Sequence, residues 1–319
     1  MTLHENTEQF KAAIHAASDH FSVREEFIEK DYWVTFILKK LSESEFCDQV
    51  VFKGGTSLSK VYNLVDRFSE DIDLALIKSG KEYGGEIKKL IRSIEKNITP
   101  GLEEVEIEGV TSKKGNYRKT AYEYSKVLDN YPGSGIVDNL ILEINSFAKP
   151  VPYKWEKVAS LISRFFTESN QAVRTREFGM NSFQLNVLVP ESTLIEKILS
   201  VIRLSFYKDN IEQLKKKVRH FYDIYFLSRS ESGEKFLNSD DFTTRFKSML
   251  EEDKGKFTDP VEWLEADYKA APVLNEFDKF WDKIKSTYNS DFKDLVHGKF
   301  PDEKEIANQF RKIISILKK

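Results

Sequence analysis

The sequence predicts an α+β fold, in which a mixed sheet with flanking helices is followed by a helical bundle. Two observations support this class. Up to Pro190, short apolar alternations typical of strands follow one another, with helical segments between them. Beyond Pro190, apolar residues recur almost only at helical spacing. We therefore expect two domains, which cover residues 1–190 and residues 191–319.

The first domain is expected to contain both helices and strands. In chain order these are helices at 6–18 and 24–42, a strand at 49–53, a helix at 57–66, a strand at 71–77 and a helix in "EIKKLIRSIEKNI". Three more strands should follow in "VEIEGV", "YRKTAYEYSKVL" and "LILEINSF", with "NYPGSG" as the turn between the last two. A strand–helix–strand unit followed by adjacent strands implies a mixed sheet with helices on one side.

The second domain should be a series of helices. In "ESTLIEKILSVIRLSFY", Thr193 and Glu196 have the spacing of a capping box at a helix start. The segment "EQLKKKVRHFYDIYFLSRS" places one apolar stripe on a helix, formed by Leu214, Val218, Phe221 and Tyr225. The last helix is expected to open at "PDEKEIANQF".

Composition narrows the classes of function. The 319 residues carry a formal net charge of −3, so no basic excess over the whole chain marks a nucleic-acid-binding protein. Cys47 is the only cysteine, which excludes a disulfide framework and a zinc site built from several cysteines. The N-terminal stretch does not resemble a signal peptide, and no apolar run is long enough to span a membrane. We expect a cytoplasmic protein without a membrane partner.

Two aspartates one residue apart lie within an apolar strand pattern in "VVFKGGTSLSKVYNLVDRFSEDIDLAL", residues 50–76. Strand alternation sends Asp71 and Asp73 to one face, about 7 Å apart along the backbone. Two neighbouring carboxylates repel each other unless a positive charge lies between them. A divalent cation held by oxygen ligands and by substrate phosphates meets that need.

The residues before this strand are suited to binding phosphate. Gly54 and Gly55 allow a tight turn and a close approach to a ligand. Thr56 or Ser57 is expected to cap the helix that follows, whose free N–H groups would attract an anion. The segment is not a Walker A loop, because Lys60 follows a serine and lies inside the predicted helix.

A third acid is expected on a later strand. In "NLILEINSF", Glu143 is a polar residue in mid-strand with apolar neighbours on both sides. Together with Asp71 and Asp73 it would complete a site for two metal ions, which clamp the attacking and leaving oxygens of a phosphoryl transfer.

The order of these parts resembles that of the polymerase-beta-type nucleotidyltransferases. More specifically, "FKGGTSLSKVYNLVDRFSEDIDL" is similar to the AbiEii/AbiGii toxin family, which includes the MenT toxins. Three further segments support the resemblance: "EKDYW" at 29–33, "ESTLIEKILSVIRL" at 191–204 and "RHFYDIYFL" at 219–227. It implies a polymerase-beta-type sheet domain followed by a helical domain that completes the active-site cleft.

The resemblance also implies roles for individual residues. Gly55 and Ser57 would hold the nucleoside triphosphate, and Asp71 and Asp73 would bind magnesium or manganese. Lys197 matches the lysine of the family's third motif, which is expected to contact the phosphates. Asp223 matches the aspartate of the fourth motif, and Glu143 takes the place of the third acid. The loop "VDRFSE", which contains Arg67 and Ser69, receives no role.

The implied activity is a magnesium-dependent transfer of a nucleoside monophosphate from an NTP to an acceptor, with RNA, and specifically the 3′ end of tRNA, as the expected acceptor. The protein would be the toxin of a type IV toxin–antitoxin pair that acts in abortive infection, with a separately encoded DNA-binding antitoxin. Two alternatives remain open: a nucleotide-binding regulator without catalysis, and a nucleotidyltransferase that modifies a protein hydroxyl.

Several of these residues also have ordinary structural interpretations. Asp71 and Asp73 could form a solvated sheet edge, and Lys197 could be a surface lysine. Asp223 has the i,i+4 spacing of a helix salt bridge with Arg219, and His220 is interpreted as a structural hydrogen-bonding residue or a phosphate contact.

Other segments are open in the same way. In "EKDYW", helix packing would bury Tyr32 and Trp33 and expose Lys30 and Asp31. Two basic stretches, "TSKKGNYRKTAYEYSK" and "KKKVRH", could bind RNA or be solvated surfaces.

Overall fold

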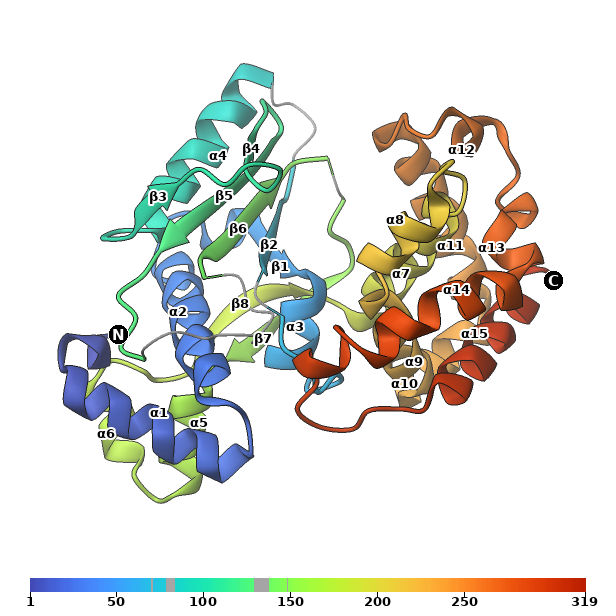
Figure 1. Ribbon diagram of the computed structural model, residues 1–319. Helices are drawn as coiled ribbons and strands as arrows, with labels where there is room; N and C mark the ends of the chain where they lie inside the picture. The colour runs from blue at the N-terminus through green and yellow to red at the C-terminus, as the bar shows by residue number, and fades with distance from the viewer. Residues whose placement is uncertain (70, 79–83, 129–137, 148) are drawn as a thin grey trace. The chain divides into compact units, whose positions relative to one another are not determined.

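The computed structural model describes residues 1–69, 71–78, 84–128, 138–147 and 149–319. These residues form two compact units (Figure 1). The first unit comprises Met1–Asn63 and Phe68–Leu188, and the second comprises Leu64–Arg67 and Val189–Lys319. The segment Leu64–Arg67 therefore lies in the second unit, although the residues on both sides of it in the sequence belong to the first.

A mixed sheet forms the centre of the first unit. Its strands are β1 (Val50–Lys53), β2 (Asp71–Leu76), β3 (Glu103–Val105), β4 (Ser112–Lys113), β5 (Tyr117–Glu123), β6 (Leu140–Asn145), β7 (Tyr153–Val158) and β8 (Phe183–Leu188). They are ordered β3-β5-β6-β2-β1-β8-β7, and β4 pairs with β5. The β1–β8 and β2–β6 pairs are parallel and the others antiparallel. The prediction of a mixed sheet is confirmed.

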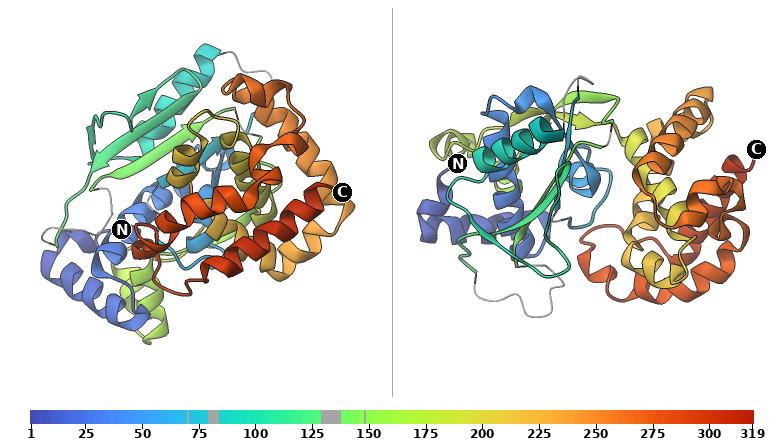
Figure 2. Two further views of the ribbon diagram at one scale, coloured as in Figure 1. Left: turned by 45° about the vertical axis from the view of Figure 1, so that its right-hand side comes forward. Right: turned by 90° about the horizontal axis from the view of Figure 1, so that it is seen from above.

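Helices of the first unit precede, interrupt and follow these strands. They are α1 (Thr7–Phe21), α2 (Glu25–Ser42), α3 (Gly54–Lys60), α4 (Gly84–Ile98), α5 (Leu161–Glu168) and α6 (Ala172–Glu177), with single 3₁₀ turns at Leu3–Glu5 and Cys47–Gln49. The views in Figure 2 show the blue helix α2 and the teal helix α4 on the same side of the sheet. The sequence predicts helices on one side, which holds for α2 and α4, whereas α3 lies on the opposite face, where its Gly54 contacts Asp73.

Several elements differ from the sequence-based expectation. The helix expected at 57–66 begins at Gly54 and ends at Lys60, and the strand expected in "VEIEGV" ends at Val105. Strands β4, β7 and β8 and helices α5 and α6 lie outside the expected elements. The predicted turn "NYPGSG" lies outside the described residues.

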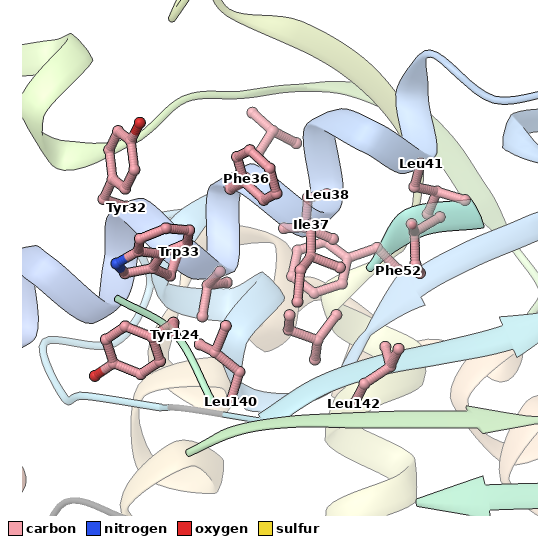
Figure 3. Close-up of a cluster of buried hydrophobic side chains, with 14 of the residues drawn as sticks. Tyr32, Trp33, Phe36, Ile37, Leu38, Leu41, Phe52, Tyr124, Leu140 and Leu142 are labelled. Carbon is pink, nitrogen blue, oxygen red and sulfur yellow. The ribbon is translucent and has the colours of Figure 1, made fainter. Parts of the chain in front are cut away.

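The core of the first unit lies between the sheet and α2 (Figure 3). Helix α2 contributes Tyr32, Trp33, Phe36, Ile37, Leu38 and Leu41, which pack against Phe52 of β1 and against Leu140 and Leu142 of β6. Ile72, Leu74 and Leu76 of β2 also belong to this core. Because strand side chains alternate, Asp71 and Asp73 project from the opposite face of the sheet, as predicted.

Polar side chains of α2 anchor neighbouring elements. The Asp31 carboxylate pairs with Lys60 Nζ of α3 and accepts a hydrogen bond from the Leu161 backbone N–H (2.7 Å) at the start of α5. Two residues earlier in α2, Glu29 Oε1 accepts a hydrogen bond from the Val127 backbone N–H (2.6 Å). Lys30 is 0% exposed. The expectation that Lys30 and Asp31 are exposed is wrong, because Lys30 is fully buried and Asp31 is mostly covered by its partners in α3 and α5.

The second unit is helical throughout, apart from short connections. Its helices are α7 (Pro190–Leu204), α8 (Asn210–Lys216), α9 (Arg219–Arg229), α10 (Glu231–Leu237), α11 (Asp240–Lys256), α12 (Val261–Glu265), α13 (Pro272–Asn275), α14 (Phe277–Asn289) and α15 (Glu303–Leu317), with 3₁₀ turns at Tyr268–Ala270 and Lys293–Leu295. Helix α9 packs against α7, α10 and α15. Its Phe221 ring contacts the rings of Phe277, Trp281 and Phe310.

Helix starts in this unit differ from the predicted ones. Helix α7 begins at Pro190, so Thr193 lies inside it and the predicted capping box with Glu196 is not formed. The Thr193 hydroxyl is buried and has no hydrogen-bond partner among the described residues. A capping box is present at α15, between Asp302 and Glu305. In the described part of the chain, no helix combines the length and the apolar character needed to cross a membrane.

Candidate active site

A row of charged residues crosses the face of the sheet opposite the core. The strand register pairs Lys53 of β1 with Asp73 of β2, Asp73 with Glu143 of β6, and Glu143 with Lys119 of β5. Directly paired residues project to the same face, with Cβ atoms about 5 Å apart. We call these four residues the charged row. Asp71 lies two residues before Asp73 on the same face, so the sheet brings together all three acids that the sequence selects.

The turn from β1 into α3 accommodates the Asp73 carboxylate. Gly54 has a φ of +80°, which side chains other than glycine rarely adopt. A Cβ atom at Gly54 would lie 2.0 Å from Asp73 Oδ2, closer than any real contact. The carboxylate therefore packs directly on the backbone at the start of α3, and glycine is the residue that permits this contact. Sequence reasoning selected Gly54 for its freedom to turn but did not identify Asp73 as the group that needs the space.

Thr56 and Ser57 do not cap α3, contrary to the expectation. The residue that caps this helix is Lys53, whose side chain makes no capping hydrogen bond. Thr56 Oγ1 lies 2.5 Å from the Asp71 carbonyl oxygen and 3.0 Å from Ser69 Oγ. Since a carbonyl only accepts, the Thr56 hydroxyl donates to Asp71. Thr56 thus joins α3 to the first residue of β2, and it fixes the backbone that carries Asp71.

Ser57 is also bonded locally. Its Oγ donates to the Gly54 carbonyl oxygen over 2.9 Å, and the residue is 0% exposed. The hydroxyl therefore stabilises the first turn of α3 after the glycine. Gly54, Gly55, Thr56 and Ser57 all lie in α3, which begins where the charged row meets β1.

Glu143 is oriented by a tyrosine. The Tyr117 phenol of β5 donates a hydrogen bond to Glu143 Oε2 (3.2 Å). Burial, followed by the negative charges of Glu143, Asp73 and Asp71, raises the pKa of Tyr117 well above its usual range. The phenol therefore keeps its proton and remains a donor. Sequence reasoning interpreted Tyr117 only as a base-stacking residue.

The carboxylate oxygens of Asp71 and Asp73 match the ligands that magnesium and manganese prefer. Magnesium sites commonly use one or two carboxylates together with substrate phosphates. Across the residues that the structure describes, no group of three or more His, Cys, Asp or Glu side chains is arranged to hold a metal ion. The described arrangement therefore offers the pair Asp71 and Asp73, with Glu143 hydrogen-bonded to Tyr117.

The two remaining predicted residues, Lys197 and Asp223, meet in the second unit. Asp223 of α9 accepts from Arg67 Nε at Oδ1 (2.6 Å) and from Arg67 Nη2 at Oδ2 (2.7 Å). Lys197 Nζ of α7 lies 2.6 Å from Asp223 Oδ2. We call these three residues the Asp223 cluster. Lys197 is 7% exposed, so the interpretation of this residue as a surface lysine is wrong.

Burial and charge act in opposite directions on the Asp223 cluster. Burial alone would raise the pKa of Asp223, but Arg67 and Lys197 overcome this effect and lower the pKa to about 2. Burial lowers the pKa of Lys197, while the Asp223 charge raises it. No sequence pattern indicates that Arg67 is the second partner of Asp223, because the two residues are 156 positions apart.

The sequence of the chain matches a known protein family over most of its length. The sequence profile of the AbiEii nucleotidyl transferase toxin family, described as a type IV toxin–antitoxin system, matches residues 37–311. The chain belongs to this family. It is therefore a nucleotidyltransferase of a toxin family, as the sequence motifs predict.

Solved structures that match the chain include two nucleotidyltransferase-type proteins. MenT4, a nucleotidyltransferase toxin from Mycobacterium tuberculosis H37Rv, is 16% identical, and the match covers 96% of this chain and 98% of MenT4 with a TM-score of 0.48. An antigenic nucleotidyltransferase-like protein from Paracoccidioides brasiliensis is 18% identical over 75% of this chain and 93% of that one, with a TM-score of 0.33. No curated protein sequence matches the chain.

The AbiEii chain offers a direct check on the role of Tyr117. We expect Tyr117→Phe to lower the transfer rate about tenfold, because one charge-assisted hydrogen bond that orients Glu143 is worth about 1.5 kcal/mol. The measurement is the initial rate of nucleotide transfer at saturating NTP. Tyr122→Phe is the matched control, since it removes a hydroxyl from the same strand but on the core side. An equal loss in both variants would contradict the role.

His220 of this AbiEii protein is kept neutral by its surroundings. Burial, followed by the positive charges of Lys197, Lys217, Arg219 and Arg67, lowers the pKa of His220 well below its usual range. Its Nδ1 atom is buried without a hydrogen-bond partner in the described part of the chain. A neutral imidazole adds no further positive charge to a region that already holds several cations.

The Asp223 cluster predicts how the stability of the protein depends on pH. The folded-state pKa of Asp223 is about 2, below its ordinary value of 3.8, so the ionised carboxylate stabilises the fold above pH 4. This contribution should disappear as the pH falls from about 4 to about 2. Urea unfolding of wild type and Asp223→Asn should show a free-energy gap that narrows over this range. A gap that is constant from about pH 5 to about pH 2 would contradict the assignment.

The basic stretches selected as RNA contacts are only partly available in the AbiEii structure. Arg118 is 8% exposed and pairs with Glu95 (2.6 Å), and Tyr122 is buried in the core. Lys113 and Lys114 are exposed, although Lys113 pairs with Glu104 (2.5 Å), and Lys119 belongs to the charged row. In the second stretch, Lys215 pairs with Glu212 of the same helix (2.9 Å). The first stretch therefore keeps its lysines and Tyr117 but loses Arg118 and Tyr122 as RNA contacts.

Proposed function

We propose that this AbiEii toxin transfers a nucleoside monophosphate from an NTP to the 3′ end of tRNA and releases pyrophosphate. The acceptor hydroxyl oxygen attacks the α-phosphorus, the bond from that phosphorus to the bridging oxygen breaks, and the acceptor proton leaves. The observation that carries the proposal is the packing of the Asp73 carboxylate on Gly54, on the sheet face that also carries Asp71 and Glu143. This arrangement places two acids beside a helix start, where a triphosphate finds backbone N–H groups.

Individual residues of the first unit take the following roles in this proposal. Asp71 and Asp73 would hold magnesium or manganese, which would neutralise the phosphate charge that develops during transfer. Lys53 and Lys119, at the ends of the charged row, attract the triphosphate to the same face. Glu143, oriented by Tyr117, accepts the acceptor proton or supports the metal-binding pair.

Family likeness supplies the other parts of the proposal. Lys197 matches the position from which family members would contact the phosphates, and Asp223 holds Lys197 by an ion pair of 2.6 Å. The acceptor is proposed as tRNA, and exposed Lys113 and Lys114 offer phosphate contacts at the β4 end of the sheet. The antitoxin would be a separately encoded DNA-binding repressor, and the reaction would take place in the cytoplasm, where tRNA is available.

Purified protein incubated with each labelled NTP, magnesium or manganese, and total tRNA tests the function directly. We expect label in tRNA, with one nucleotide preferred, and none in Asp73→Asn. Label in protein instead of RNA would move the acceptor to a protein hydroxyl. Absence of label from all RNA and protein, while the NTP binds normally, would overturn the transferase activity and leave a nucleotide-binding regulator.

A further inference from the structure

The second unit contains a piece of chain from the region of the sequence motif. Residues Leu64–Arg67 lie between α3 and β2 in the sequence but belong to the second unit. In the structure, Val65 is 3% exposed and Arg67 is 2% exposed. A segment this short is normally a surface loop, so its burial in a separate unit needs a cause.

Backbone contacts hold one side of the segment. Arg67 forms an antiparallel bridge with Val296, and the His297 N–H donates to the Asp66 carbonyl oxygen (3.0 Å). The Lys299 N–H lies 3.3 Å from Asp66 Oδ2 and donates to it. A Cβ atom at Gly298 would lie 2.4 Å from Asp66 Cβ, so the two chain segments are in close contact. The segment is thus joined to residues 296–299 by one isolated β-bridge and by hydrogen bonds to Asp66.

The Asp223 cluster holds the other side. Both oxygens of the Asp223 carboxylate are bonded, and the residue is 0% exposed. A buried carboxylate shared by two cations has little capacity left for a substrate or a metal ion. Removal of one partner would leave buried charge without compensation, which is strongly destabilising. The geometry of Asp223 therefore suits a structural anchor.

The anchored segment lies close in the chain to the metal-binding pair. Arg67 precedes Asp71 by four residues, so the backbone between them spans at most about 14 Å. On the other side of this short span, Thr56 binds the Asp71 carbonyl oxygen. Two contacts thus bear on Asp71, the first residue of β2. Thr56 of the first unit binds its carbonyl oxygen, and the backbone joins it to Arg67 of the second unit.

We propose that Asp223 is a positioning residue: by binding Arg67 it holds the segment Leu64–Arg67 and, through it, the start of β2 that presents Asp71. Its effect on activity would therefore pass through Arg67. This inference rests on the proposed nucleotide transfer only for its kinetic consequence, because the anchoring itself is a property of the fold.

Hydrogen exchange tests the anchoring without reference to activity. Amides in peptides that cover residues 64–76 should exchange about tenfold faster in Asp223→Asn and in Arg67→Gln than in wild type, because the segment opens more often. Asp253→Asn is the control, since it breaks an ion pair with Arg203 in the same unit without touching the segment. Unchanged exchange over 64–76 in a folded Asp223→Asn protein would overturn the proposal.

A double-mutant cycle tests the kinetic consequence. We expect Asp223→Asn and Arg67→Gln each to reduce transfer about 100-fold, since misplacement of a catalytic group by 1 Å has a cost of that size. The double variant should be no slower than the slower single variant, because both act through one contact. Losses that multiply would show that Asp223 acts independently of Arg67, and the positioning role would be wrong.

The anchoring can still be tested if Asp223→Asn does not fold or if wild type transfers no nucleotide. If Asp223→Asn does not fold, Arg67→Lys takes its place, because it keeps the charge but loses the contact through two nitrogens. We expect Arg67→Lys to show faster exchange over 64–76 with a smaller loss of transfer, and wild-type behaviour in both would overturn the anchor. If wild type transfers no nucleotide, the proposed function fails, and the exchange comparison alone decides this inference.

Discussion

Replacement of Asp73 by asparagine is expected to lower the rate of nucleotide transfer about 1,000-fold, which corresponds to about 4 kcal/mol of lost transition-state stabilisation. Asparagine keeps the size of the side chain but removes the charge that would hold a divalent cation. Single-turnover transfer of labelled nucleotide at several manganese concentrations measures the effect. The loss should persist at every metal concentration, because an amide oxygen is a weak substitute for a carboxylate.

Two controls define this result. Glu123→Gln removes an acid from an exposed position at the end of β5 and should leave transfer unchanged. The melting temperature of Asp73→Asn should remain at or above that of wild type, since the substitution relieves repulsion between Asp71 and Asp73. A transfer rate of Asp73→Asn within a factor of about ten of the wild-type rate would show that Asp73 is not a metal ligand.

Substitution of Gly54 by alanine should lower transfer about 100-fold, the cost associated with a displacement of about 1 Å in a reacting group. The new Cβ atom would lie 2.0 Å from Asp73 Oδ2, so the carboxylate must move away. The positive φ of +80° adds strain to the backbone, which costs about 1 to 2 kcal/mol of stability. Transfer rate and urea unfolding together separate the two effects.

The chain offers a matched control for this substitution. Gly101 has a φ of +76°, but a Cβ atom there meets nothing within 4 Å. Gly101→Ala should therefore show a similar loss of stability and no loss of transfer. Equal activity losses in the two variants would attribute the effect of Gly54 to backbone strain, and the packing of Asp73 on Gly54 would lose its functional meaning.

Local sequence patterns were sufficient to place the acids on one face of a strand and to predict the fold class. Strand alternation placed Asp71 and Asp73 on the face away from the core, and this is what the structure shows. The two glycines marked the turn at Gly54. Both features depend on a few neighbouring residues, and such information is present in a single sequence.

Long-range partners could not be predicted in the same way. Arg67 and Asp223 are 156 positions apart, and Asp31 meets Lys60 and Leu161 from two other helices. No period or spacing in one sequence indicates such contacts. For the same reason Thr56 was assigned to a helix cap, since the pattern of a cap is local whereas its actual acceptor, the Asp71 carbonyl, lies on the next strand.

The segment Leu64–Arg67 has a consequence for how the chain can be divided. The backbone passes from one unit to the other after residues 63, 67 and 188, so a single cut at 188 does not yield two complete parts. The N-terminal fragment would retain four residues that complete the interior of its missing neighbour. If recombination exchanged only the C-terminal half between relatives, the new half would have to fit residues 64–67 of the old one. The two halves are thus constrained to evolve together.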